Sequence, residues 1–556
     1  GGDKLMAEVI KVLGSHVYVQ VFESTRGLKV GAEAEFTGHM LEVTLGPGML
    51  SKNYDGLQND LDKMDGVFLK RGQYTYPLDK ERVWHFVPLA NVGDKVQASA
   101  WLGQVDENFQ PLKIMAPFTM KGTATVKTIM PEGDYKIEDT IAILTDEEGN
   151  DIPVTMIQRW PVKRAMTNYK EKPRPFKLLE TGVRVIDTLN PIVEGGTGFI
   201  PGPFGTGKTV LQHAISKQAE ADIVIIAACG ERANEVVEIF TEFPELVDPH
   251  TGRKLMERTI IIANTSNMPV AAREASIYTG ITLAEYYRDM GYDVAIMADS
   301  TSRWAEALRE LSGRLEEMPA EEGFPAYLAS RLSAFYERAG MMQTLCGAEG
   351  SVSIIGAVSP QGGDFSEPVT MNTKRFVRCF WGLDKSLAYA RHFPAIHWLT
   401  SYSEYLQDLS PWYKDHVNKN FVDMRNQLMG ILNSESSLME IVKLIGSDVL
   451  PDDQKLTLEI ARVIRLGFLQ QNAFHPDDTC VSLEKQYKMM EVILYLYKKS
   501  KALVTMGMPM SVLKEDKIFD RVVSIKYDVP NDRLDLFDTY KKDIDTFYDK
   551  VLEKNG

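Results

Sequence analysis

The sequence has few cysteines and no long apolar run. Its 556 residues include four cysteines: Cys229, Cys346, Cys379 and Cys480. They lie far apart and never form a C-x-x-C pair, which argues against a zinc site or a disulfide framework and favours a reducing compartment. No apolar run approaches the ~18–20 residues that span a bilayer, and the N-terminus lacks the pattern of a signal peptide. The sequence therefore predicts neither a membrane span nor an export signal.

Basic residues are also in short supply. The chain has 62 lysines and arginines against 77 aspartates and glutamates, for a net charge of −15. This balance disfavours nonspecific binding to nucleic acid or anionic lipid as the main role. The content of 44% hydrophobic and 25% charged residues is that of an ordinary globular protein, without repeats or low-complexity segments. The composition favours a component of a soluble assembly.

The most informative motif is a glycine-rich loop, Gly202-Pro-Phe-Gly-Thr-Gly-Lys-Thr209, which matches G-x-x-x-x-G-K-[ST]. An apolar run ending at Pro201 precedes it and a helical pattern follows it, so strand, loop and helix are in the required order. The glycines let backbone N–H groups converge on phosphates, Lys208 supplies a positive charge, and Thr209 offers a hydroxyl to Mg²⁺. The loop thus predicts a nucleoside triphosphate ligand. Its predicted nucleotide-binding residues are Gly202, Pro203, Phe204, Gly205, Thr206, Gly207, Lys208, Thr209 and Val210.

Four regions of different character follow one another along the chain. Residues 1–69 and 70–170 alternate apolar and polar residues between glycines, which predicts two β-rich modules, with short strands near 9–12, 17–22 and 34–36 in the first. The strand pattern begins almost at residue 1, so we expect the first strands of this module to precede the sequence. Residues 171–407 alternate buried-strand and helical patterns, which predicts a parallel sheet covered by helices. Residues 408–556 read as a helical bundle.

Two predicted strands of the third region end in charged residues. Glu231 and Arg232 follow Ile223–Cys229, and Asp299 follows Val294–Ala298. The carboxyl ends of parallel strands form the ligand edge of such a sheet, so Glu231 is the candidate to orient an attacking water and Asp299 the candidate to hold Mg²⁺ through water. An ordinary solvated Glu-Arg pair explains the first spacing equally well.

Arg303 extends the polar rim beyond Asp299. Two roles are open to it from the spacing alone: an approach to phosphate, or an ion pair with Glu306 three residues later in a helix.

Several separated motifs carry a resemblance over nearly the whole chain. They are Leu45–Gly48, Tyr54–Gly56, Gly182–Asp187, the phosphate loop, Cys229–Arg232, Ala298–Trp304, Ser359–Pro368 and Pro394–Ser403. On these stretches the sequence resembles the catalytic A subunits of the V-type and archaeal-type rotary ATPases, relatives of the F-type β subunit. The resemblance implies a multidomain α/β protein: an N-terminal β-barrel, an inserted β-rich bulge, a nucleotide-binding α/β domain with a parallel sheet, and a C-terminal helical domain that bears on the central shaft.

The resemblance also implies roles for single residues. Lys208 and Thr209 hold the phosphates and Mg²⁺, Glu231 activates water, Arg232 supports the phosphate network, and Asp299 is the metal carboxylate, in agreement with the roles argued from the residues. Two further positions, Phe393 and Phe474, match the aromatic rings that sandwich adenine. Spacing alone would make both of them core residues.

The same resemblance implies partners. B subunits would alternate with this chain in an A3B3 ring and supply an arginine in trans, next to central-shaft and peripheral-stalk subunits. The ring would lie at the cytoplasmic face of the membrane, coupled indirectly to a membrane rotor that transports protons or sodium ions. The expected activity is hydrolysis or synthesis of ATP.

Two other functions share part of the pattern. A hexameric P-loop nucleic-acid motor would carry the same loop and carboxylates, but it should also show a basic or aromatic nucleic-acid module, which the acidic composition disfavours. A non-catalytic nucleotide-binding structural subunit is disfavoured because Lys208, Thr209, Glu231 and Asp299 are all present.

Overall fold

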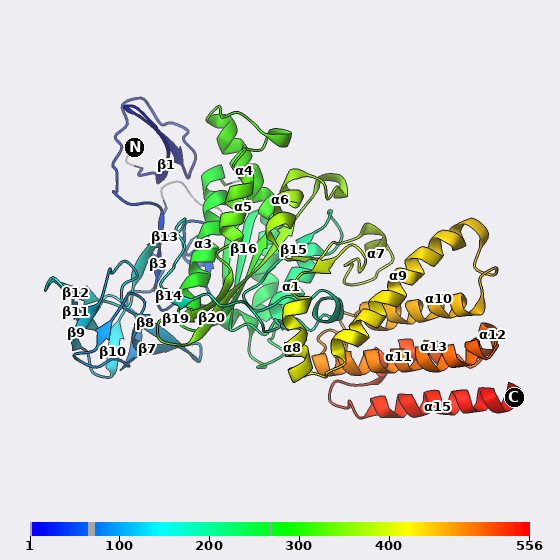
Figure 1. Ribbon diagram of the computed structural model, residues 1–556. Coiled ribbons are helices and arrows are strands. Elements are labelled where there is room, and N and C mark those ends of the chain that lie inside the picture. Colours follow the sequence, from blue (N-terminus) through cyan, green and yellow to red (C-terminus); the bar gives the residue numbers. More distant parts are fainter. Residues whose placement is uncertain (1–2, 65–72, 267, 556) are drawn as a thin grey trace. The chain divides into compact units, whose positions relative to one another are not determined.

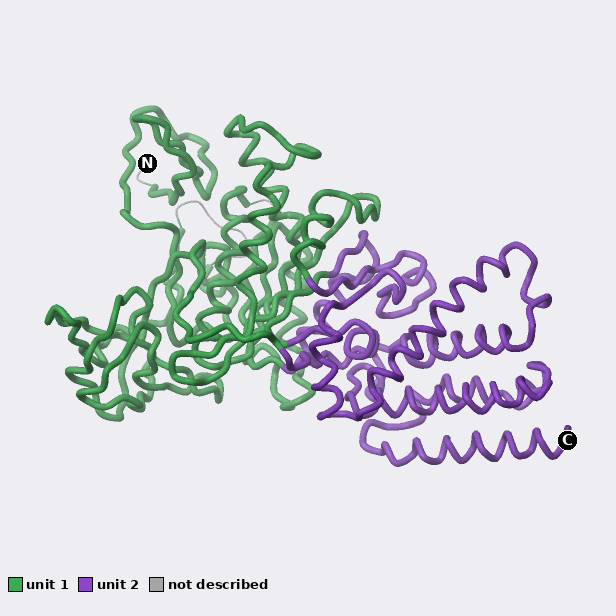
Figure 2. The backbone as a smooth tube through the Cα atoms, viewed as in Figure 1, with its two compact units in different colours: residues 1–175, 194–199, 221–377 green, residues 176–193, 200–220, 378–556 purple. Residues whose placement is uncertain are grey.

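The structure, a computed structural model, describes residues 3–64, 73–266 and 268–555. The chain divides into two compact units, each built from several segments (Figure 2). Unit 1 comprises residues 1–175, 194–199 and 221–377, and unit 2 comprises residues 176–193, 200–220 and 378–556. Within the described ranges, every helix is too short or too polar to span a bilayer.

Unit 1 begins with an antiparallel hairpin of β1 (Ala7–Leu13) and β2 (His16–Val21), visible in dark blue in Figure 1. Gly14 adopts a φ of +60° in the turn between them, a conformation that glycine adopts without strain. The strand expected at 34–36 does not form, and Phe36 there is 68% exposed. Alternation of side chains makes a strand only where a partner strand accepts its hydrogen bonds, and this prediction was therefore wrong.

The β-rich region after the hairpin contains two four-stranded antiparallel sheets, ordered β10-β5-β7-β8 and β12-β11-β9-β6. Their strands are β5 (Val83–Pro88), β6 (Lys95–Val96), β7 (Trp101–Glu107), β8 (Gln110–Met115), β9 (Ala124–Ile129), β10 (Gly133–Lys136), β11 (Ala142–Thr145) and β12 (Asp151–Val154). Trp84 and Phe86 of β5 are buried, so alternate residues of this strand face a core. A separate short pair joins β3 (Glu42–Leu45) to β13 (Gln158–Pro161).

A parallel sheet forms the centre of unit 1, with neighbouring strands in the order β15-β20-β18-β16-β17-β4. The strands are β4 (Asn53–Tyr54), β15 (Thr197–Pro201), β16 (Ile223–Glu231), β17 (Thr259–Thr265), β18 (Asp293–Asp299) and β20 (Glu349–Val358), with β19 (Gly340–Thr344) and β14 (Tyr169–Glu171) added antiparallel. Every residue of β16 except Glu231 is buried, as expected for a strand covered on both faces. The predicted parallel sheet is confirmed.

Helices cover this sheet (Figure 1). Those of unit 1 are α2 (Ala233–Glu242), α3 (Val270–Arg288), α4 (Thr301–Arg314), α5 (Leu328–Tyr336) and α6 (Pro368–Phe376). Helix α3 packs on β16, β17, β18 and β20. It lies very close to the sheet at Gly280, where an added Cβ would stand 3.1 Å from Ile296 Cδ1 and 3.3 Å from Ala227 Cβ. The absence of a side chain there sets the spacing of the two layers.

Unit 2 is mainly helical. Its elements are η2 (Val185–Leu189), α1 (Lys208–Gln218), β21 (Cys379–Phe380), α7 (Lys385–Tyr389), β22 (Tyr402–Ser403), α8 (Leu406–His416), α9 (Phe421–Ile445), α10 (Asp452–Ile464), η7 (Arg465–Leu469), α11 (Leu483–Thr505), α12 (Met510–Lys514), α13 (Ile518–Val523), α14 (Ile525–Asp528) and α15 (Leu536–Asn555). The segments η2 and η7 are π-helical. The apolar stripes predicted for the tail are core, since Phe421, Leu428 and Met490 are fully buried. The predicted C-terminal helical bundle is confirmed.

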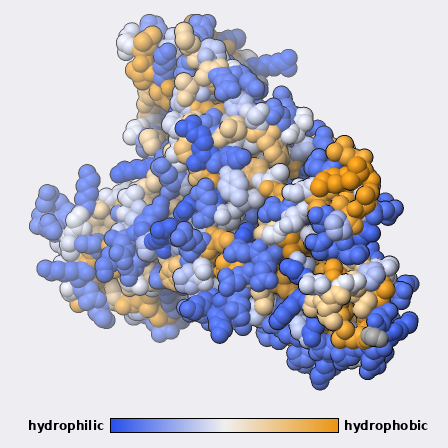
Figure 3. Space-filling view, turned by 45° about the vertical axis from the view of Figure 1, so that its right-hand side comes forward, coloured by the Kyte–Doolittle hydropathy of each residue, from blue (hydrophilic) through white to orange (hydrophobic). Residues whose placement is uncertain are grey.

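One end of unit 2 carries exposed apolar side chains. Ile441, Leu444 and Ile445 of α9 and Val449 just beyond it are between 41% and 85% exposed. Apolar surface also gathers on the face of the molecule shown in Figure 3. Exposed apolar groups in proximity are typical of an interaction surface.

Candidate active site

The phosphate loop lies in unit 2 and leads directly into α1, which begins at Lys208. Gly205 and Gly207 have φ values of +84° and +81°, in the left-handed region where residues with a Cβ are strained. These conformations turn the chain sharply into the helix. The first turn of any helix has amide N–H groups without partners inside the helix, and these groups attract anions. The loop therefore has the geometry of an anion site.

The loop is closed from within by Thr206. Its hydroxyl donates to the carbonyl oxygen of Pro203 at 2.7 Å, and the side chain is buried. The backbone at Gly202 is packed so closely that a Cβ would stand 2.7 Å from Thr206 Oγ1 and 2.8 Å from Leu383 Cδ1. Phe204, by contrast, is 87% exposed. Thr206 thus uses its hydroxyl to hold the loop's shape.

Both aromatic residues of the predicted base site also lie in unit 2, in two segments joined by the backbone. The N–H of Gln471 donates to the carbonyl of Phe393 at 2.7 Å, and the N–H of Phe474 donates to Asn472 Oδ1 at 2.9 Å. Phe393 is half-buried, whereas Phe474 is 96% exposed. The core position that spacing alone suggested is therefore wrong for Phe474.

The segment of Phe393 is tied to the strand that leads into the phosphate loop. The N–H of Leu383 donates to the carbonyl of Pro201 at 2.9 Å, and the N–H of Asp384 donates to the carbonyl of Ala395 at 2.9 Å. Unit 2 thus brings the loop and both aromatic residues together through a continuous set of backbone contacts.

The carboxylates lie in unit 1, at the carboxyl ends of two neighbouring parallel strands. In the register of β16 and β18, Ala228 pairs with Asp299, and Glu231 is the last residue of β16. Asp299 is 7% exposed and Glu231 is half-buried. The structure therefore places both acids at the same edge of the sheet, as their positions after apolar strands predicted.

A bulge at Gly230 sets the direction of Glu231. The pairing of β16 with β17 is irregular between Cys229 and Glu231, and Gly230 has a φ of +68°. An extra residue in a strand turns the next side chain to a new direction, and such bulges are frequent beside active sites. Sequence patterns gave no sign of this bulge, although a glycine at the end of an otherwise apolar strand is its usual signal.

Two arginines stand beside the acids. Arg303 packs on Gly230, where an added Cβ would lie 2.9 Å from Arg303 Cβ, and its Nη1 lies 3.1 Å from Glu306 Oε2. The ion pair with Glu306, one of the two predicted alternatives, is thus formed. Arg232 is exposed and is the residue before α2.

The donors predicted for Mg²⁺ are hard oxygen ligands. Thr209 offers an exposed hydroxyl in the first turn of α1, and Asp299 offers a carboxylate at the end of β18. Among the described residues, no three side chains of His, Cys, Asp or Glu gather as a metal-binding group. Few protein ligands, all oxygen, fit Mg²⁺, which keeps several waters and phosphate oxygens around it.

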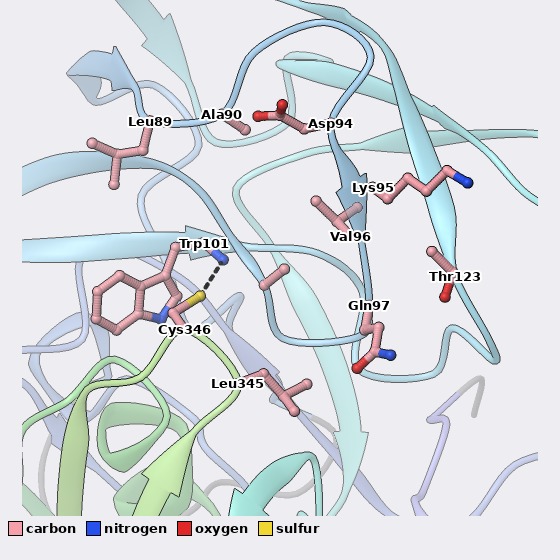
Figure 4. Close-up of a pocket in the computed structure, with 11 residues that line it drawn as sticks. Leu89, Ala90, Asp94, Lys95, Val96, Gln97, Trp101, Thr123, Leu345 and Cys346 are labelled. Atoms are coloured by element: carbon pink, nitrogen blue, oxygen red, sulfur yellow. Dashed lines mark hydrogen bonds between the residues drawn. The ribbon is translucent and has the colours of Figure 1, made fainter.

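A separate surface cavity of about 530 Å³ lies in unit 1, between the β-rich region and the turn that carries Cys346 (Figure 4). Trp101 and Cys346 line it, and the backbone N–H of Trp101 lies 3.4 Å from Cys346 Sγ. None of the predicted site residues lines this cavity.

Sequence comparison covers most of the chain. The sequence profile described as the ATP synthase alpha/beta family, nucleotide-binding domain, matches residues 182–403. Profiles of the family's beta-barrel domain, its barrel-sandwich domain and the C-terminal domain of V and A type ATP synthase match residues 1–38, 75–163 and 410–512. These matches confirm the predicted fold class, from barrel through inserted β-rich domain and nucleotide-binding core to helical domain. The nucleotide-binding match supports ATP and ADP as ligands.

Relatives extend this result to full length. The V-type ATP synthase alpha chain of Halothermothrix orenii is 50% identical over 558 residues, covering 100% of this chain and 94% of the relative. The corresponding A chain of the A-type ATP synthase of Methanopyrus kandleri is 50% identical over 561 residues, with the same coverage. A solved structure of the assembled ATPase EscN, from the type III secretion system of enteropathogenic E. coli, has a TM-score of 0.61 at 20% identity. It covers 89% of this chain and 93% of its own, and at that identity it supports the fold alone.

Fold, phosphate loop and profile together define a nucleotide-binding subunit of the ATP synthase alpha/beta class. Within that class, the chain belongs to the family formed by the alpha chains of V-type ATP synthases and their counterparts in A-type ATP synthases. It is a catalytic subunit of a multisubunit enzyme that couples ATP turnover to ion transport, as the sequence predicted.

Proposed function

We propose that Lys208, Thr209, Glu231 and Asp299 form the centre at which ATP is hydrolysed or synthesised. The phosphate loop geometry carries this proposal: left-handed glycines turn the chain so that the amides at the start of α1 face an anion. Lys208, the first residue of that helix, neutralises charge on the β and γ phosphates. Lys208 and the amides together stabilise the charge that develops during phosphoryl transfer.

Thr209 and Asp299 hold Mg²⁺, Thr209 through its hydroxyl and Asp299 through a water. When bound, Mg²⁺ neutralises phosphate charge and orients the terminal phosphate. Asp299 suits this role because a strand end fixes its position while burial strengthens its field.

Glu231 acts on water. The bulge at Gly230 directs its carboxylate from the sheet edge, where it orients water for in-line attack on the γ phosphate and accepts its proton. Arg232, immediately after it, supports the phosphate network. Arg303, already paired with Glu306, contributes to the phosphate rim through its position against Gly230.

Phe393 and Phe474 hold the base between their rings. An aromatic ring that is 96% exposed loses nothing in stability by waiting for a partner, and stacking on adenine covers its apolar face. This accounts for an exposed phenylalanine in an otherwise polar loop.

The ring in which this site works is assembled from A and B subunits in alternation, as A3B3, with an arginine of B completing each site in trans. The exposed apolar end of α9 faces the central shaft, and peripheral-stalk subunits hold the ring. The assembly is a peripheral head at the cytoplasmic face, and it drives a membrane rotor that carries protons or sodium ions. Of the predicted alternatives, a nucleic-acid motor and a non-catalytic subunit, neither needs the paired acids at this edge.

The test is Glu231→Gln in the chain assembled with its B subunit. We expect ATP turnover to fall by about 100-fold or more while ATP affinity stays within about twofold, because the amide cannot accept the proton. Glu238→Gln, which changes an exposed carboxylate of α2, is the matched control and should leave turnover intact. Unchanged turnover in Glu231→Gln would remove Glu231 from the mechanism.

A further inference from the structure

Unit 2 contains an ion pair with no exposed side-chain surface. Arg184 Nη1 lies 2.6 Å from Asp478 Oδ1, and both side chains are 0% exposed. Burial lowers the pKa of the Arg184 guanidinium, although Asp478 opposes this effect. A buried pair of this kind costs about as much in desolvation as it gains, so stability alone is a weak reason for its presence. Its contacts indicate a positional role.

The other donors of Arg184 point at one short segment. Nε donates to the carbonyl of Phe468, and Nη2 donates to the carbonyl of Gln470 at 2.8 Å. The backbone N–H of Arg184 donates to Gln471 Oε1 at 2.6 Å. These carbonyls belong to or follow the π-helical turn η7, whose end lacks helical partners. Arg184 therefore fixes the exit of the chain from that turn.

Asp478 closes the other end of the same loop. Its Oδ2 accepts the N–H of Asn472 at 2.7 Å, and Gln471 Nε2 donates to its carbonyl at 2.9 Å. Residues 472 and 478 are thereby held together, and Phe474 stands in the loop between them. We call Arg184, Gln471 and Asp478 the loop clamp.

The loop clamp also reaches the second aromatic segment, because the N–H of Gln471 donates to the carbonyl of Phe393 at 2.7 Å. We propose that the loop clamp positions Phe393 and Phe474 for the nucleotide base, with Arg184 as its central positioning residue. This inference rests on the proposed base-binding role of these two rings. It assigns to Arg184 an effect on recognition of the base and none on the phosphates.

A second cation supports the same segment. Lys526 Nζ donates to the carbonyl of Leu466 at 2.7 Å and to that of Gln470 at 3.1 Å. Cationic donors thus converge from two elements on the carbonyls that precede Phe474. This pattern fits a loop that must hold one position while its central side chain remains exposed.

The experiment compares binding of MgATP with binding of magnesium tripolyphosphate to the full chain, by titration calorimetry. Arg184→Lys keeps a charge beside Asp478 but loses the planar fork that contacts Phe468 and Gln470. We expect it to weaken MgATP binding about 10-fold, the equivalent of one lost stacking contact, and to leave tripolyphosphate binding within about twofold. Phe474→Ala should give the same pattern.

Arg425→Lys is the matched control. Arg425 Nη2 donates to the carbonyl of Leu189 at 2.7 Å in the same unit, but no contact of Arg425 with residues 468–478 is found among the described residues. It should change neither ligand. If Arg184→Lys does not fold, the uncharged double variant Arg184→Met with Asp478→Leu keeps the volume and should show the same selective loss, because such replacements are often neutral in stability.

Equal loss of both ligands, or wild-type MgATP binding in folded Arg184→Lys, overturns the inference. Failure of the proposed function has another signature: Lys208→Ala would leave the binding of both ligands unchanged. Unchanged MgATP binding in Phe474→Ala would remove the base site and the inference with it.

Discussion

Arg303 stands so close to Gly230 that no side chain fits between them: a Cβ on Gly230 would lie 2.9 Å from Arg303 Cβ and 3.3 Å from Arg303 Cγ. The same glycine has a φ of +68° and precedes Glu231. The contact couples α4 to the bulge that directs the catalytic carboxylate.

Gly230→Ala should therefore harm both stability and turnover. The new methyl group must displace Arg303 Cβ, and alanine is strained at this φ, so we expect a loss of ~1–3 kcal/mol in unfolding free energy. Turnover should fall more than about 10-fold because Glu231 moves. Gly313→Ala is the control, since an added Cβ there meets nothing within 4 Å and should be neutral or stabilising. Urea unfolding and ATPase assays measure both effects, and full activity in Gly230→Ala would contradict the proposed bulge function.

Asp299→Asn should change the response to Mg²⁺. The amide is a weaker partner for a metal-bound water than the carboxylate, so we expect the Mg²⁺ concentration for half-maximal turnover to rise by about 10-fold or more. ATP binding in EDTA should not change. Asp293→Asn is the matched control because Asp293 begins the same strand and accepts the Ser351 hydroxyl at 2.7 Å. Identical Mg²⁺ dependence in Asp299→Asn and wild type would exclude the metal role.

Glu107 should make stability depend on pH. Burial raises the pKa of its carboxyl from 4.5 to about 7, opposed by hydrogen bonds from the N–H groups of Gly48 and Leu50. The folded pKa is above the unfolded value, so this contribution to stability is fully present below pH 4.5 and is lost as pH rises through 7. Glu107→Gln keeps an acceptor oxygen without the charge, and it should unfold at a higher urea concentration than wild type at about pH 8, by roughly 1–3 kcal/mol. The advantage should disappear at about pH 4.5, and equal differences at both pH values would refute the assignment.

Cys346 should be the fast-reacting thiol of the native chain. It is exposed, whereas burial raises the pKa of Cys229, Cys379 and Cys480 to about 12. Thiolate is the reactive form, so these three should react at least ~100-fold more slowly. Kinetics with a fluorescent thiol reagent measure this, and Cys346→Ser should abolish the fast phase. MgATP binding should survive labelling, because the phosphate loop contains no cysteine. A fast phase that persists in Cys346→Ser would locate the reactive thiol elsewhere.

The strength of the sequence predictions followed the range of the interactions involved. The phosphate loop is eight consecutive residues, and its strand, loop and helix are local, so Lys208 could be placed at the start of a helix. The strand ends at Glu231 and Asp299 were predicted because parallel strands present their carboxyl ends at one edge. The strand expected at 34–36 failed because a strand depends on a partner from elsewhere in the chain.

The sequence by itself determined the ligand class, the order of domains and the acids at the sheet edge, because each is written in local spacing or in motif identity. Only the tertiary structure decided that Phe474 is exposed, that a bulge turns Glu231, and that Arg184 meets Asp478 across 294 residues of sequence. Those features come from contacts between distant segments, where burial and hydrogen-bond geometry select partners that no periodicity along the chain can indicate.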